Sequence, residues 1–277
     1  MALISIILGL FLDRRWNTLA QWRQFGWFSK LSHSVLEKTE PHLHNPTARY
    51  LALLAIPILA TLFIQNLSSG WFTPLSLLFA FVVFVYCLGT QNIEQQIDQI
   101  ISAFRDGQPA AAHAIIEDLS GDSTVNDENS LQLCLSSTLN LMTERLFGVI
   151  FWFAILGPAG ALLYRLSQQF LSIYRDDPIF SKSAERMSEL LNWLPERFLA
   201  ISFAITGHFE GALAAFKENK ETDRSGQYLL IDICLGALEG NDSNDKAAYL
   251  SAYRGLVLRS MIFWLATIAV LFLLGWN

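Results

Sequence analysis

An almost wholly apolar run is interrupted near its centre by Gly157, Pro158 and Gly160; it occupies positions 146–165 and reads LFGVIFWFAILGPAGALLYR. A helix that crosses a bilayer needs about 20 apolar residues, so this run is long enough to span. Proline removes a backbone donor, and lipid cannot satisfy the polar groups that a helix break exposes. The break therefore predicts a broken or re-entrant hairpin covered by protein or water, either at a binding site or as a packing kink.

Four other apolar segments accompany this run, at residues 2–12, 50–67, 71–88 and 256–276. The first is short for a full span, whereas the next two are separated only by Ser68, Ser69 and Gly70 and predict a membrane hairpin. Hydrophobic residues make up 52% of the chain and the mean hydropathy is +0.34. The expected fold is an all-α, polytopic helical membrane protein with four to five membrane segments, forming a single integral membrane domain over residues 1–277.

The charge distribution predicts how these segments are oriented. Cations are concentrated in residues 13–49 and again in residues 165–255, and the turn at 68–70 has none. The positive-inside rule makes the basic segments cytoplasmic, together with the polar, helically patterned residues 90–145. This favours a re-entrant 146–164 over a spanning one, with 198–216 as an amphipathic or partly inserted helix. If 146–164 spans instead, residues 166–196 face outward.

Composition and motifs exclude several classes of function. The net charge of −6 argues against nucleic acid as a partner. Three cysteines without CxxC spacing signal neither disulfides nor zinc, and His42 with His44 is too small a set for a metal site, so no metal is expected. Phosphate-binding, dinucleotide-binding, serine hydrolase and zinc protease motifs are missing from the sequence, and no cofactor is indicated.

Charged residues border the broken run: Glu144 and Arg145 precede it, and Tyr164 and Arg165 close it. Charges at such positions are commonly snorkelling anchors or ion pairs. If the run folds back at its glycines, however, its two ends meet, and two arginines beside a carboxylate can clamp a phosphate or carboxylate. In that arrangement Glu144 is the candidate catalytic group and the other three residues are candidate ligand-binding groups.

Further polar candidates lie downstream. Arg197 follows Pro195 at an expected helix start, where a cation needs an acidic partner such as Glu144 or Glu189. His208 stands on an apolar helix, which is more typical of a hydrogen-bonded core histidine than of a ligand. Glu189, Arg197 and His208 are further ligand-binding candidates.

Three stretches resemble the AmpE family: FWFAILGPAGALLYR at 151–165, LLNWLPERFLAISFAITG at 190–207 and ALAAFK at 212–217. The resemblance covers essentially the full length. It implies a multi-pass inner-membrane protein of proteobacteria, implicated in regulating β-lactamase induction and associated with an amidase that acts on anhydro-muropeptides. Asn192, in the second stretch, becomes a further ligand-binding candidate.

The same stretches are similar to the CobD/CbiB adenosylcobinamide-phosphate synthases. The residues that match that pattern are Phe151, Trp152, Gly157, Pro158, Gly160, Ala161, Tyr164, Arg165, Asn192, Pro195, Arg197 and Gly207. The chain departs from it in three places: Asp13-Arg14-Arg15-Trp16 replaces an acidic signature, Leu166-Ser167-Gln168-Gln169 replaces an Asn-Thr-Leu-Asp run, and Ser188-Glu189 replaces an acid pair. These departures argue against corrinoid synthesis and leave a remodelled polar site.

The function expected from the resemblance is therefore that of an inner-membrane regulatory protein linked to β-lactamase induction and muropeptide sensing, with no demonstrated enzymatic activity. The alternative is a membrane-embedded ligase or transferase that acts on an amphiphilic or phosphorylated substrate. A transporter is disfavoured by the small number of spans. The expected partners are the lipid bilayer and a muropeptide, nucleotide or phosphorylated small molecule. The sequence leaves open whether the chain forms a homo-oligomer.

Overall fold

The computed structural model describes residues 5–10, 25–40, 43, 45–71, 73–89, 93–222 and 226–274, and every regular element in these ranges is helical. The predicted all-α class is therefore confirmed. The chain divides into two compact units, Met1–Gln91 with Glu144–Leu194, and Asn92–Thr143 with Pro195–Asn277. One integral membrane domain stays a prediction, because a membrane domain can contain more than one compact helical unit.

Three segments of the described residues are long and apolar enough to cross a membrane, namely Pro46–Leu67, Ser130–Tyr174 and Lys246–Leu273. Shorter apolar helices accompany them at Leu75–Cys87 and Tyr228–Ala237. Large apolar side chains such as Leu59, Phe63 and Leu273 are exposed on the long segments. A soluble protein rarely leaves such continuous apolar surface in water, so these helices fit a polytopic membrane protein.

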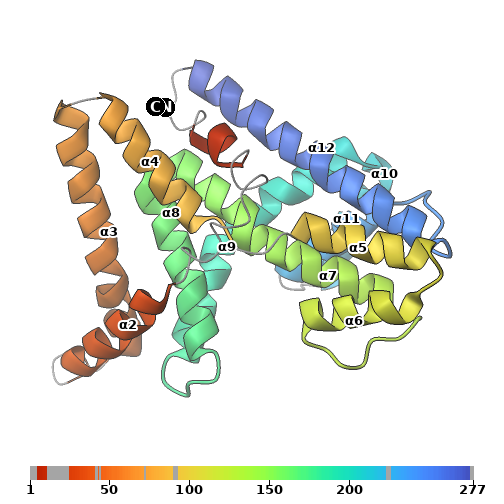
Figure 1. Cartoon of the computed structure of the whole chain (residues 1–277), viewed down its shortest axis with the longest axis horizontal. Helices are drawn as coiled ribbons and strands as arrows, with labels where there is room; N and C mark the ends of the chain where they lie inside the picture. Colours follow the sequence, from red (N-terminus) through yellow and green to blue (C-terminus); the bar gives the residue numbers. More distant parts are fainter. Residues whose placement is uncertain are drawn as a thin grey trace. The chain divides into compact units, whose positions relative to one another are not determined.

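The first unit contains helical residues 5–10, α2 (Gly26–Thr39), α3 (Pro46–Trp71), α4 (Thr73–Cys87), α8 (Gly148–Tyr174) and the first part of α9 (Ser181–Thr206). Helices α3, α4 and α8 pack on one another, and α2 packs on α3 and α8 (Figure 1). The turn expected at residues 68–70 lies inside α3, which continues to Trp71. Serine and glycine weaken a helix without ending it, and Pro74 suits the first turn of α4.

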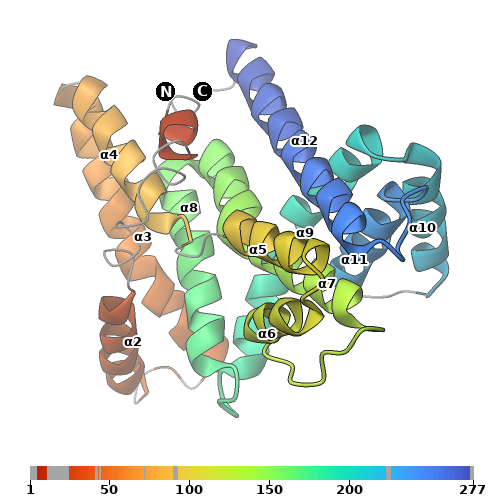
Figure 2. The same ribbon diagram turned by 45° about the vertical axis from the view of Figure 1, so that its right-hand side comes forward.

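The second unit contains α5 (Ile93–Arg105), α6 (Pro109–Ser120), α7 (Ser130–Met142), the end of α9, α10 (Phe209–Thr222), α11 (Gly226–Ala237) and α12 (Lys246–Leu273). Helix α5 packs on α6 and α12, α6 packs on α7, and α10 packs on α11 (Figure 2). The isoleucines of α5 form its buried face, as their helical spacing predicts. The helix expected over 198–216 is interrupted between Thr206 and Phe209, because Gly207 approaches the Ala237 carbonyl too closely for a side chain.

Helix α8 is folded back on itself at Gly157, whose φ of 66° and ψ of −153° are not helical. A Cβ on Gly148 would lie 2.2 Å from the ring of Tyr164, and one on Gly160 would lie 2.3 Å from the Trp152 carbonyl oxygen. In one straight helix, residues 148 and 164 would be about 24 Å apart. Residues 148–156 and 158–174 are therefore two antiparallel arms, which confirms the predicted Gly-Pro-Ala-Gly hairpin.

This hairpin runs along α3. The Gln65 amide nitrogen, near the end of α3, lies 3.6 Å from the position of a Cβ on Gly157. The rings of Tyr50, near the start of α3, and Phe170 are 4.3 Å apart. The tip of the hairpin thus lies beside the end of α3, and its second arm returns to the start. Because Gly148 contacts Tyr164, the first arm comes from the same direction, as a re-entrant segment requires; its re-entry into a membrane stays a prediction.

Candidate functional site

A short π-helix, Thr143–Phe147, joins α7 to the first arm of α8 and carries Glu144 and Arg145. Such π-turns are rare within α-helices and are frequent at functional sites. The backbone carbonyl of Arg145 accepts a hydrogen bond of 3.4 Å from the Gly89 amide. A Cβ on Gly89 would lie 2.6 Å from the Arg145 side chain, so only glycine lets the end of α4 approach this closely.

The fold-back brings the two charged ends of the broken run together. The Glu144 carboxylate interacts electrostatically with Arg145, Arg165 and Arg175, and the Arg145 and Arg165 guanidinium groups interact with each other. Glu144, Arg145 and Arg165 are all half-buried. The Arg165 guanidinium carbon also lies 5.5 Å from the centre of the Phe25 ring, a cation–π contact. We call Glu144, Arg145 and Arg165 the charged cluster.

Beside the charged cluster, Tyr164 enters a network of neutral side chains that joins the second arm of α8 to α9. The fully buried Tyr164 hydroxyl donates to Asn192 Oδ1 over 2.7 Å. Gln168 Nε2 donates to the same oxygen over 3.2 Å, and Ser188 Oγ donates to Gln168 Oε1 over 3.1 Å. Asn192 Nδ2 donates to Ser188 Oγ over 3.5 Å, which closes a ring of three residues. Each of the three side chains in the ring finds its hydrogen-bond partners within it, so Asn192 is held in place. Asn192 in turn fixes the Tyr164 hydroxyl, and this positions Tyr164 and the adjacent Arg165.

Sequence analysis missed two members of this ring. Gln168 and Ser188 stand where the chain departs from the CobD/CbiB pattern, so the resemblance gives neither of them a role. In the structure they bond to each other and to Asn192, which the pattern retains. Gln168 and Ser188 are far apart along the chain, so no local sequence pattern indicates that their side chains meet.

A second link between α8 and α9 depends on Pro195. Proline has no amide hydrogen, so the carbonyl of Leu191, four residues earlier, has no helical donor. The Trp152 indole Nε1 donates to this carbonyl over 3.0 Å. Pro195 was expected to start a helix, but it lies inside α9, which begins at Ser181. The expectation was wrong because a donor from the first arm of α8 replaces the lost backbone bond.

Three further candidates are distributed over the two units. Glu189 is exposed on the part of α9 that belongs to the first unit, and Arg197 and His208 belong to the second unit. The His208 side chain is 47% exposed, so it is not a core histidine; its Nδ1 lies 3.3 Å from Glu239 Oε2. The same Nδ1 accepts from the Gly211 amide over 3.1 Å. His42 and His44 lie outside the described residues, among which no group of three or more His, Cys, Asp and Glu side chains could hold a metal.

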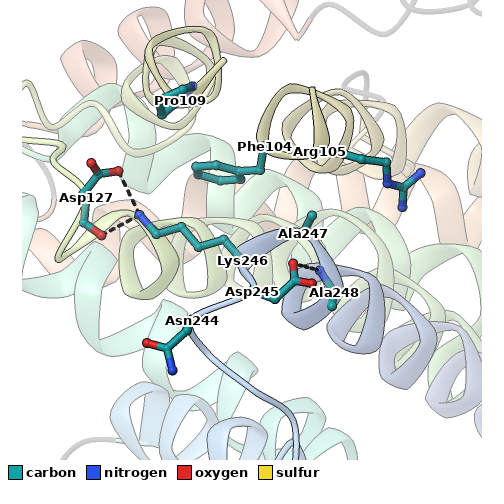
Figure 3. A pocket seen from close by; sticks show the side chains of 9 residues that line it. All are labelled: Phe104, Arg105, Pro109, Asp127, Asn244, Asp245, Lys246, Ala247 and Ala248. Carbon is teal, nitrogen blue, oxygen red and sulfur yellow. Dashed lines mark hydrogen bonds and ion pairs between the residues drawn. The ribbon is translucent and has the colours of Figure 1, made fainter. Parts of the chain in front are cut away.

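The second unit has an open cavity of about 670 Å³ at the start of α12 (Figure 3). Its lining includes Lys246, whose Nζ donates to Asp127 Oδ1 over 2.9 Å and to the Asp127 carbonyl over 2.6 Å. The ammonium also lies 5.3 Å from the centre of the Phe104 ring. The hydrogen bond from Lys246 lowers the pKa of the Asp127 carboxyl. Since the protein itself occupies these donors, the contact ties the 121–129 loop to α12 rather than offering a ligand site.

A model of the family described as "Regulatory signalling modulator protein AmpE" matches residues 1–275 of the chain. The chain belongs to the AmpE family. Within this AmpE-family protein, the match covers both arms of α8, the charged cluster and α12. Together with the long apolar helices, it makes the chain a membrane protein of this family.

Curated relatives of this AmpE-family chain include two proteins named "Cobalamin biosynthesis protein CobD". The one from Stutzerimonas stutzeri is 28% identical over 180 residues, which cover 63% of this chain and 57% of the relative. The one from Chromobacterium violaceum is 26% identical over 213 residues, covering 73% of this chain and 68% of the relative. The matched region thus spans little more than half of the first relative. No solved structure matches the AmpE-family chain.

Proposed function

We propose that this chain is a regulatory protein of the bacterial inner membrane that takes part in β-lactamase induction by binding an anionic ligand at the charged cluster. The observation that carries the proposal is the fold-back of α8, which joins the charged ends of an otherwise apolar run. Ionisable residues within membrane segments are costly and usually functional. The family description as a regulatory signalling modulator supports the same role.

The cluster suits an anion that competes with an internal counter-ion. Glu144 offsets the positive charge of Arg145 and Arg165, which would otherwise repel each other at close range. A phosphate or carboxylate ligand pairs with the arginine forks and releases Glu144 from them. Because Glu144 lies in the π-helix, its release changes the backbone between α7 and α8, and this change is the signal.

The geometry of the hairpin supports access from the cytoplasm. Tyr164 and Arg165 stand near the middle of the second arm, which follows α3 from Gln65 back to Tyr50. The open ends of both arms therefore lie toward the start of α3, which the basic segment 13–49 precedes along the chain. By the positive-inside rule this side is cytoplasmic. A muropeptide, a nucleotide or a phosphorylated small molecule reaches the cluster from there.

The test is β-lactamase induction in a host whose own copy of the gene is replaced by variants. Arg165→Ala removes one arm of the clamp, so we expect induction by a β-lactam to change at least several-fold. Arg186→Ala is the matched control, because Arg186 is exposed on α9 and outside the charged cluster. If β-lactamase induction is normal in the strain that carries Arg165→Ala, and this variant is present in the membrane fraction in the wild-type amount, the proposal is contradicted.

The alternative function is a ligase or transferase acting on an amphiphilic or phosphorylated substrate. The two relatives named for cobalamin biosynthesis favour it, as does a half-buried carboxylate that interacts electrostatically with several arginines. In that case Glu144 is the general base and the arginines bind the anionic part of the substrate. Glu144→Gln distinguishes the two functions: an enzyme retains binding and loses turnover, whereas a receptor loses the internal counter-ion and binds the anion more tightly.

A further inference from the structure

Helix α10 in the second unit has an apolar face that no protein element covers among the described residues. Phe209, Leu213 and Phe216 share one side of the helix, and their side chains are 57%, 38% and 46% exposed. The opposite side packs on α11, where a Cβ on Gly211 would lie 2.3 Å from the Gly236 carbonyl oxygen. The exposed band is therefore not a loosely packed core face, since α10 already has its protein partner.

The exposed band continues from a surface that suits lipid. The end of α9 packs along α12: Trp264 Nε1 donates to Ser202 Oγ over 2.7 Å, and the Thr206 and Ser260 hydroxyl groups are 2.9 Å apart. The buried side of α9 thus faces an apolar segment long enough to cross a membrane. Its outward side exposes Ile201 and Ile205, whereas Phe198 lies on the same side as Ser202 and contacts the Trp264 ring. Exposed apolar side chains that flank a segment long enough to cross a membrane suit contact with acyl chains.

A charged residue marks where this lipid-facing surface ends. Arg259 Nε donates to the carbonyl of Thr206, the last residue of α9, over 3.0 Å. Arg259 is the last charged residue of α12, after Lys246 and Arg254, and an arginine that precedes an uncharged apolar segment places its guanidinium toward the membrane–water interface. Helix α10 begins at Phe209, three residues after the carbonyl that Arg259 binds. The start of α10 is therefore at the level of the interface.

We propose that α10 lies in the plane of the membrane interface, with Phe209, Leu213 and Phe216 inserted among the lipid head groups. The exposed polar side, which carries Glu210, Lys217 and Glu218, faces water. This division of one helix into an apolar band, a protein-packed side and a charged side is typical of interfacial helices. The proposal does not depend on the ligand of the charged cluster. Under this proposal the second unit contacts the membrane through α10 in addition to α12.

The test is spin-label accessibility in lipid nanodiscs, using the full chain with its three buried cysteines replaced by alanine. Labels are placed singly at Leu213→Cys and Phe216→Cys, with Ala214→Cys and Glu218→Cys as controls on the exposed polar side of the same helix. Oxygen concentrates in lipid and a nickel chelate stays in water. We expect the ratio of oxygen to nickel accessibility to be several-fold higher at 213 and 216 than at the controls.

Two outcomes would overturn the proposal. High nickel accessibility at all four positions would mean that α10 is surrounded by water. Low accessibility to both reagents at 213 and 216 would mean that protein covers the band, as in contact with a second copy of the chain. The two labelled positions guard against a single substitution that disturbs folding. A separate single-label variant, Ile262→Cys on the exposed face of α12, gives the accessibility expected of a lipid-facing position.

Discussion

Gly148 lies against the ring of Tyr164, so its missing side chain decides how closely the arms of α8 approach. A Cβ at this position would lie 2.2 Å from the ring, and the fully buried tyrosine cannot move without breaking its bond to Asn192. We predict that Gly148→Ala destabilises the protein by about 1–3 kcal/mol through overpacking, measured by unfolding in detergent.

Gly255→Ala is the control for this prediction. Gly255 is also helical, but its Cβ would meet only the tip of the flexible Arg259 side chain, at 3.4 Å. Alanine there should be neutral or stabilise by about 0.5–1 kcal/mol, since it restricts the unfolded chain. Equal effects of the two substitutions would show that the arms do not touch at Gly148.

Trp152 and Pro195 are linked through the Leu191 carbonyl, which makes their substitutions non-additive. Trp152→Phe leaves this carbonyl without its indole donor, and we expect a loss of about 1–3 kcal/mol. In a Pro195→Ala background an amide hydrogen is again available to the carbonyl, so Trp152→Phe should cost clearly less. Equal costs in the two backgrounds would indicate that Trp152 stabilises only by packing.

At the scale of elements, the start of α12 is held to the 121–129 loop by Lys246 and Asp127. The pKa of Asp127 is lowered in the folded protein, so the contact contributes fully above the ordinary aspartate pKa of about 3.9. The contribution is lost as pH falls through the folded-state pKa. We predict that the hydrogen-exchange protection factors of residues 121–130, which are corrected for the intrinsic pH dependence of exchange, fall over this acid range. Asp127→Asn should exchange faster at neutral pH and lose most of the pH dependence.

Pro158 and Pro195, two of the prolines inside helices, show how far an element can be predicted from its residues. Pro158 follows Gly157, and the pair correctly predicts the break in α8, because a positive φ favours glycine and proline suits the next helix start. Pro195 has no such glycine, and the same reasoning wrongly starts a helix there. The helix continues through Pro195 because Trp152 donates to the freed carbonyl, a contact between residues far apart in the chain.

At the scale of the whole molecule, the re-entrant hairpin makes a topological prediction for the first unit. Single cysteines at Glu37, in α2, and Asp176, after the second arm, should react with an impermeant thiol reagent from the same side of the membrane. A cysteine at Ser69, near the end of α3, should react from the opposite side. The measurement is labelling in intact cells and in inverted vesicles. Labelling of Asp176 on the side of Ser69 would mean that the run spans.

The sequence by itself determined the helical membrane class, the family and the break at Gly157, because hydropathy, helix-breaking residues and local motifs depend only on neighbours along the chain. It also identified the charged residues at the ends of the broken run. Only the tertiary structure decided that these ends meet and that Gln168 and Ser188 hold Asn192. Such contacts depend on how closely distant segments pack, which glycines and buried hydrogen bonds set in three dimensions.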